Sequence, residues 1–143
     1  MDEQKDWLGR GWAWPIRLDP FTGCIELAEF ESDIRQSILI ILNTDPGERV
    51  MRPDFGGGVH DLIFAAVNTA MLTRLEEAVR DSLLRYEARI EVLGVRTDPL
   101  LAADGIVRVE IEYRVRKTNQ THNLVYPFYY REGRFGAVEE EAR

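Results

Sequence analysis

Two contrasting periodicities predict an α+β fold, in which a small sheet with a C-terminal β-hairpin packs against two or three helices. Between residues 70 and 89, apolar side chains recur every three or four positions, as on one face of a helix. Between residues 107 and 116, apolar and charged residues alternate strictly, as on a strand with one buried and one charged face. The helices are therefore expected to cover one face of the sheet.

Residues 1–24 are expected to form a tryptophan-rich N-terminal arm. Three tryptophans lie within eight positions, among glycines and a proline, and show no helical period: Trp7, Trp12 and Trp14. Large apolar side chains are costly to leave in water, so the arm should pack on a surface. Two alternatives stay open. The arm packs on its own domain, or it forms a partner surface, because tryptophan is enriched at binding hot spots.

The main domain is predicted over residues 25–131, followed by an acidic tail at residues 132–143. A short strand is expected at residues 25–27. Ser32 is a suitable N-cap for the first helix. The turn at residues 45–47 should end that helix, because it contains a proline followed by a glycine.

Two further helices are expected after the loop that follows this turn. Residues 59–67 predict a short apolar helix, and the long helix should span residues 70–89. Thr69 is the candidate N-cap of the long helix.

The last third of the chain predicts strands. The first is expected at residues 90–96, and the alternating segment at 107–116 is the clearest strand of the chain. A turn at residues 118–121 should connect it to a returning strand at 124–130. Pro127 lacks a backbone donor, which favours an edge position for that strand.

Composition narrows the possible functions. The 143 residues suit one domain, and a net charge of −7 argues against general nucleic-acid binding, which needs clustered Lys and Arg. Cys24 is the only cysteine, so an intrachain disulfide is excluded. The N-terminus lacks signal-peptide order, and the apolar run at residues 38–42 is too short to span a bilayer. We therefore expect cytoplasmic synthesis and no membrane insertion.

Motifs for cofactor, metal or nucleophilic chemistry are weak. The three glycines at 56–58 have no nearby lysine and do not follow a strand, so neither a P-loop nor a dinucleotide turn is indicated. His60 and His122 lie at a helix start and in the expected hairpin turn, without metal-ligand spacing. No cofactor and no metal are expected.

Paired carboxylates are the remaining catalytic candidates, because a glycosidase needs two that flank a cleft. Glu48 and Asp54 are the obvious pair. Arg49 and Arg52 flank Glu48, however, and would hold its carboxylate ionised, which is the wrong tuning for a general acid. We expect an ion-pair network here and no catalytic residue.

One run resembles a known family. The segment IRQSILIILNTDPGERVMRPDFGGGVHDLIF, the long helix and ARIEVLGV are similar to the W-type baseplate wedge proteins of contractile phage tails. That family includes the sheath initiators of phage-tail-like injection systems and of type VI secretion baseplates. The resemblance covers residues 11–130, and its most specific part is the order T-x-x-G-E-R-V-M-x-P-x-F-G.

The resemblance implies a structural, non-enzymatic subunit in the baseplate of an assembled particle. In the family, a loop docks on the helical core bundle of the wedge, and its matching positions here are Glu48, Arg49, Arg52 and Pro53. Sheath subunits would extend the C-terminal strands. The resemblance further implies six copies in a ring and suggests contact with the inner tube or hub.

The C-terminal hairpin agrees with strand sharing, because an exposed edge can accept another chain's strand. Val125 and Tyr129 are the edge positions expected to meet sheath strands. The charged positions expected to set register are Arg108, Glu110, Glu112 and Arg114. The alternative for these charges is an ordinary solvated face. The alternative function is a peptidoglycan-degrading tail lysozyme, a label that the family carries.

Overall fold

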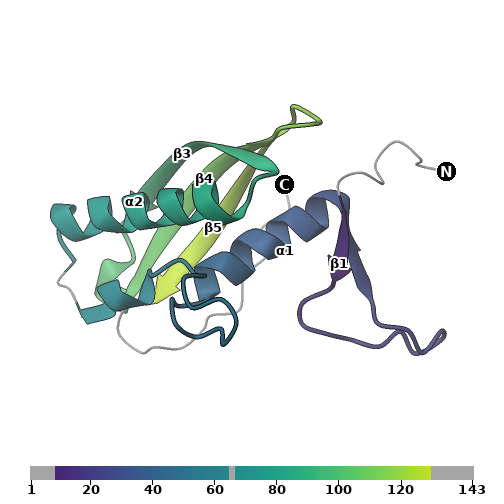
Figure 1. The fold of residues 1–143 in the computed structure, drawn as a ribbon. Helices are drawn as coiled ribbons and strands as arrows, with labels where there is room; N and C mark the ends of the chain where they lie inside the picture. Colours follow the sequence, from purple (N-terminus) through teal and green to yellow (C-terminus); the bar gives the residue numbers. More distant parts are fainter. Residues whose placement is uncertain (1–8, 65–66, 130–143) are drawn as a thin grey trace. The chain divides into compact units, whose positions relative to one another are not determined.

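The protein's structure, a computed structural model, describes residues 9–64 and 67–129. The chain forms two compact units, Met1–Ile40 and Ile41–Arg143. Figure 1 shows the helices and strands coloured along the chain. Helices and antiparallel strands both occur, so the predicted α+β class is confirmed.

The described part of the first unit begins with a hairpin, where the sequence predicted an irregular arm. Strand β1 (Arg10–Trp12) pairs with β2 (Leu27–Glu29), and Trp12 lies opposite Leu27. A further bridge joins Leu18 to Ile25, so the hairpin continues beyond the two strands. The predicted strand at 25–27 therefore belongs to the returning half of this hairpin.

Helix α1 (Phe30–Asn43) starts two residues before the predicted cap Ser32. The N-terminal hairpin is tied to the first turns of this helix. The Trp14 backbone N–H donates to the Gln36 side chain at 2.9 Å. A Cβ on Gly11 would lie 2.5 Å from the Asp33 carboxylate, so a larger residue at position 11 would displace this contact.

Helix α2 (Thr69–Tyr86) carries the predicted apolar stripe, and its buried side chains include Met71, Leu75, Val79 and Leu83. Its N-cap is Asn68 and not Thr69. The Asn68 side chain accepts a hydrogen bond from the Met71 backbone N–H at 2.8 Å. The predicted short helix at 59–67 is a 3₁₀ turn, η2 (His60–Phe64). Helix α2 ends at residue 86, three residues earlier than predicted.

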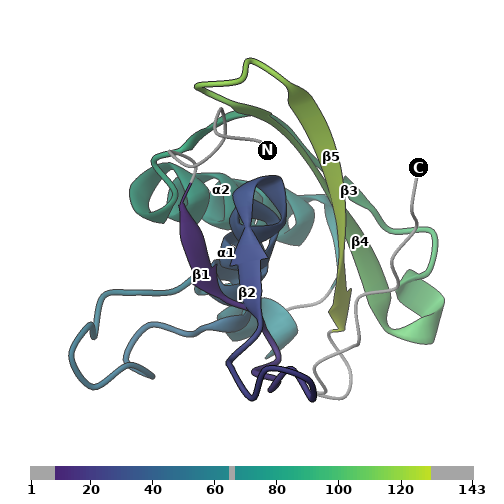
Figure 2. The same ribbon diagram turned by 90° about the vertical axis from the view of Figure 1, so that its right-hand side faces the viewer.

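The second unit holds an antiparallel sheet of order β3–β4–β5. Its strands are β3 (Ile90–Asp98), β4 (Ile106–Val115) and β5 (Thr121–Tyr129), with the short turn η3 (Ala102–Asp104) before β4. Figure 2 shows β4 and β5 side by side up to their connecting turn. Strand β5 starts at Thr121, three residues earlier than predicted, which places His122 in the strand and not in the turn.

The sheet has one buried and one exposed face. The alternation on β4 is confirmed, since Val107, Val109 and Ile111 are buried while the charged residues between them are exposed. On β5, Leu124, Tyr126 and Phe128 are buried. Helix α2 packs against β3. This arrangement leaves the charged face of the sheet outward.

Candidate partner-binding sites

The first candidate site is the loop of residues 44–58, which folds as a small closed hairpin. The Gly47 N–H donates to the Pro53 carbonyl at 2.7 Å, and the Arg52 N–H donates to the Arg49 carbonyl at 3.2 Å. At the base, the Gly57 N–H donates to the Thr44 carbonyl at 2.9 Å. Backbone hydrogen bonds therefore fix the shape of the loop.

Glycine is required where this loop returns to its base. Gly56 has φ of 139°, and a Cβ there would lie 2.3 Å from the Thr44 carbonyl oxygen. That separation is shorter than any van der Waals contact, and the oxygen belongs to the backbone, so it cannot swing away. The glycine triplet therefore serves loop geometry, as the backbone freedom of glycine allows.

Glu48 does not form the expected ion-pair network. Its Oε2 accepts a hydrogen bond from the Asp45 backbone N–H at 2.9 Å. Among the described residues, no ion pair joins Glu48 to Arg49 or Arg52. The reason is local: a carboxylate three residues after a free N–H can cap its own turn. His60 Nδ1 lies 2.7 Å from Asp45 Oδ1 on the other side of this turn.

The two arginines of the loop lie over an aromatic ring. The guanidinium carbons of Arg49 and Arg52 are 5.8 and 5.9 Å from the centroid of Phe55. Phe55 in turn contacts Tyr86 at the end of α2, with ring centroids 5.0 Å apart. Arg52 also reaches Asp54, at 3.8 Å. Cation–π contacts of this length orient both guanidinium groups without neutralising them.

The apex of the loop is apolar, which sequence reasoning missed. Val50 is 95% exposed and Met51 is 88% exposed, between the two arginines. The Arg49–Arg52 backbone contact places both residues at the turn itself. The available signal was the VM pair after the Pro46-Gly47 turn, but a pattern alone does not separate an apex from a buried loop.

The second candidate site is the outward face and free edge of the sheet. Arg108, Glu110 and Glu112 are exposed, and Arg114 forms an ion pair with Glu91 on β3. Val125 is 37% exposed on β5, and Tyr129 is half-buried at the end of that strand. The structure thus places these predicted residues on the neighbouring strands β4 and β5. Both strands are distant in sequence from the loop of residues 44–58.

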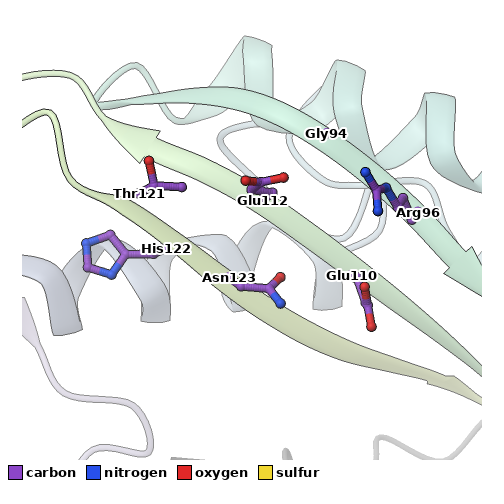
Figure 3. Close-up of a pocket in the computed structure, with 7 residues that line it drawn as sticks. All are labelled: Gly94, Arg96, Glu110, Glu112, Thr121, His122 and Asn123. Atoms are coloured by element: carbon purple, nitrogen blue, oxygen red, sulfur yellow. The ribbon is translucent and has the colours of Figure 1, made fainter. Parts of the chain in front are cut away.

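A hollow of about 350 Å³ lies on this outward face (Figure 3). It forms where Gly94 contributes no side chain, and an added Cβ at Gly94 would meet nothing within 4 Å. The residues that line it come from all three strands: Gly94, Arg96, Glu110, Glu112, Thr121, His122 and Asn123.

The N-terminal hairpin carries a third exposed surface. Trp12 is 63% exposed and Trp14 is 66% exposed, while Phe21 at the turn is 96% exposed. Trp7 lies outside the described residues.

A metal site or a membrane-spanning helix would add a further function to residues 9–64 and 67–129. In that part of the chain, no group of three or more His, Cys, Asp or Glu side chains is placed to hold a metal ion. No helix there is both long enough and apolar enough to cross a membrane.

The family model described as baseplate wedge protein gp25 matches residues 28–120. This chain belongs to that wedge family. The match begins within β2, the returning strand of the N-terminal hairpin, and includes both the loop of residues 44–58 and the charged strand β4. The predicted family resemblance is confirmed.

Individual relatives agree with this membership. The baseplate wedge protein gp25 of Enterobacteria phage T4 is 30% identical over 82 residues, which cover 57% of this wedge-family chain and 61% of the phage protein. The chain therefore spans less than two thirds of that relative's length.

Solved structures share the fold of this wedge-family chain. A Geobacter sulfurreducens crystal structure, provisionally designated a tail lysozyme, is 50% identical, with a TM-score of 0.71 over 78% of this chain and 100% of its own. A chain in the anti-feeding prophage baseplate is 26% identical, with a TM-score of 0.63 over 90% and 91% of the two chains. A chain of the postcontracted pyocin R2 baseplate, 22% identical, shares the fold with a TM-score of 0.51 over 80% and 97%.

Proposed function

We propose that this chain is a structural baseplate subunit of a contractile injection system, which docks on the wedge and anchors the first sheath subunits. The observation that carries the proposal is the match of residues 28–120 to the wedge family. Similarity to a chain in the anti-feeding prophage baseplate supports the same class of particle. Six copies in a ring, and contact with the tube or hub, remain expectations from the family.

Wedge docking is assigned to the loop of residues 44–58. Its backbone is closed by hydrogen bonds, so little conformational entropy is lost when a partner binds. Its apex presents Val50 and Met51 between the cationic Arg49 and Arg52. This combination suits an apolar depression with carboxylates at its rim. Glu48 acts indirectly, by holding the turn through the Asp45 N–H.

The docking test uses two variants of the loop apex. Met51→Ser and Arg49→Ala should leave the melting temperature of the isolated protein unchanged, because both side chains lie at the surface, and should abolish incorporation into wedges. Pull-down of the wedge proteins from particle-producing cells measures this. Leu100→Ser is the matched control, since Leu100 is 84% exposed on a different loop. Normal incorporation of both apex variants would refute the docking role.

Sheath anchoring is assigned to strand addition at β5. In this mode, main-chain hydrogen bonds supply affinity and neighbouring side chains supply specificity. Val125→Pro should prevent sheath attachment and leave baseplates intact in electron micrographs of particle preparations. Normal extended sheaths on Val125→Pro baseplates would refute strand sharing.

A peptidoglycan hydrolase is the second candidate, favoured by the designation of the Geobacter sulfurreducens relative and by two carboxylates at the hollow. A turbidity assay on purified cell wall distinguishes the two functions. Clearing that disappears in Glu110→Gln, Glu112→Gln or Glu48→Gln would establish the hydrolase and overturn the structural proposal. We expect no clearing by the wild-type protein.

A further inference from the structure

The two outer edges of the three-stranded sheet differ in how far they are blocked. On β3, the Thr97 backbone N–H donates to Glu76 Oε1 of α2 at 2.9 Å, and the Thr97 hydroxyl donates to the same oxygen at 2.8 Å. A bulge between Val92 and Gly94 also breaks the regular spacing of that strand. Side-chain capping and bulges both prevent strand pairing. Strand β3 is therefore obstructed for an added strand at Thr97 and at its bulge.

The hairpin geometry determines which groups of β5 point to its open edge. The Val115 N–H donates to the Gln120 carbonyl at 3.0 Å, so residue 120 faces β4. Backbone groups alternate sides along an antiparallel strand. With the continuous register between β4 and β5, the even-numbered residues of β5 bond β4 and the odd-numbered residues face outward. The outward set includes Asn123, Val125, Pro127 and Tyr129.

Pro127 divides this open edge into two halves. It belongs to the outward-facing set and pairs with Arg108 across the strand without disturbing the ladder to β4. Proline has no N–H, so an added strand loses one ladder bond at this position, and the ring occupies the space where that strand would lie. On the first half of β5, the N–H groups of Asn123 and Val125 have no hydrogen-bond partner among the described residues.

We propose that the partner segment pairs only with the first half of β5, from Thr121 to Val125, and stops at Pro127. This inference rests on the proposed strand sharing and specifies its register. The occupant is an extended segment of the sheath subunit. Tyr129, which the sequence placed among the pairing positions, lies beyond the stop and takes no part in the ladder.

The surroundings of this half define the chemistry of the incoming segment. On the outward face, Thr121 and Asn123 are small polar residues at the rim of the hollow of about 350 Å³. On the opposite face, Leu124 is fully buried. The segment should therefore alternate, with a polar side chain toward the hollow and an apolar side chain that extends the core. The hollow lies beside Thr121 and Asn123, in the open half of the edge. It therefore leaves room for the polar side chains that this register places on the outward face.

A proline series along β5 tests the register in complete particles. Asn123→Pro and Val125→Pro remove outward N–H groups and should each lower the fraction of baseplates with extended sheath at least tenfold. Tyr129→Pro removes the outward N–H beyond the stop and should leave that fraction unchanged. All three isolated variants should stay folded, because none of these N–H groups bonds β4. Leu124→Pro is the reference for a damaged fold, because it removes an N–H that bonds β4. Its melting temperature shows how far a disrupted sheet is destabilised.

Hydrogen exchange on the wild-type protein supplies a test that needs no substitution. In the assembled particle, the amides of Asn123 and Val125 should become protected relative to the isolated protein, while the amide of Tyr129 should not. If Tyr129→Pro blocks sheath attachment as strongly as Val125→Pro, or if the Tyr129 amide is equally protected, the register is wrong and strand sharing stands. If no proline variant affects the sheath and no amide gains protection, strand sharing itself fails.

Discussion

The hydroxyl of Tyr126 shows how a single buried group links the end of α1 to the sheet. It donates a hydrogen bond to Asn43 Oδ1 at 2.8 Å, and the Tyr126 residue is only 5% exposed. Burial, with a smaller contribution from the Asp45 carboxylate, raises the pKa of Tyr126 from 10.0 to about 12. The folded protein therefore holds this proton more tightly than the unfolded chain does.

The pKa of Tyr126 predicts a loss of stability at alkaline pH. Above pH 10 the unfolded chain releases the proton and the folded chain keeps it, so the free energy of unfolding falls until the pH reaches about 12. At about 1.4 kcal/mol per unit, the full loss is about 3 kcal/mol. Urea unfolding of wild type and Tyr126→Phe measures it. For Tyr126→Phe, the free energy of unfolding should not show this loss between pH 10 and about 12. An equal loss in the two proteins would show that Tyr126 is not its source.

The sequence did not predict which side chains cap the turn at Asp45 and the start of α2. The capping of Asp45 by Glu48 was missed, because the two neighbouring arginines offered a stronger-looking partner for the same carboxylate. Asn68 and Thr69 are both suitable N-cap residues. The sequence alone does not decide which of them is the last residue before the helix. Such choices depend on backbone angles that are set by the packing of whole elements.

At the scale of elements, periodic segments were predicted best. Helix α2 and strand β4 each bury one face over many residues, and that burial repeats in the sequence as a pattern. The N-terminal hairpin was missed for the opposite reason. The Glu26 carbonyl accepts from the Ala13 N–H, and the Glu26 N–H donates to the Arg17 carbonyl. Residues 14–16 are therefore left out of the ladder, and they interrupt the alternating pattern of a strand. The predicted irregular arm is therefore a hairpin with an interrupted pattern.

The contact between α2 and β3 gives an element-scale prediction. Glu76→Ala removes the acceptor for both the N–H and the hydroxyl of Thr97, and should lower the free energy of unfolding by about 2 kcal/mol. Glu77→Ala is the control, because Glu77 is exposed on the same helix. Thermal and urea unfolding measure the difference. Equal stability of the two variants would show that Glu76 contributes no net stabilisation.

At the scale of the whole molecule, the family and the α+β class were predictable from the sequence, and the partner surfaces only partly. The charged face of β4 follows from alternation, and the edge position of β5 follows from Pro127. The exposed apex at Val50 and Met51 does not, because exposure depends on how the loop closes. The blocked edge of β3 also required structure, since Glu76 and Thr97 are 21 residues apart.

The two sheet edges predict the association state of the isolated chain. With β3 capped and β5 interrupted by Pro127, the protein should remain monomeric at about 100 µM, helped by its charge of −7. The double variant Glu76→Ala, Pro127→Val restores ladder donors on both edges and should form concentration-dependent oligomers. Sedimentation velocity measures the change, and a monomeric double variant would contradict the role assigned to the edges.

The cap that Glu76 places on β3 has a consequence for growth of a strand-linked lattice. In polymer chemistry, a molecule with two reactive ends propagates a chain, whereas a molecule with one reactive end can only begin it. With β3 obstructed at Thr97 and β5 open, the three-stranded sheet offers one edge for the proposed strand pairing. Under the proposed strand sharing, such a sheet would begin a lattice that grows in one direction and would not join two growing ends.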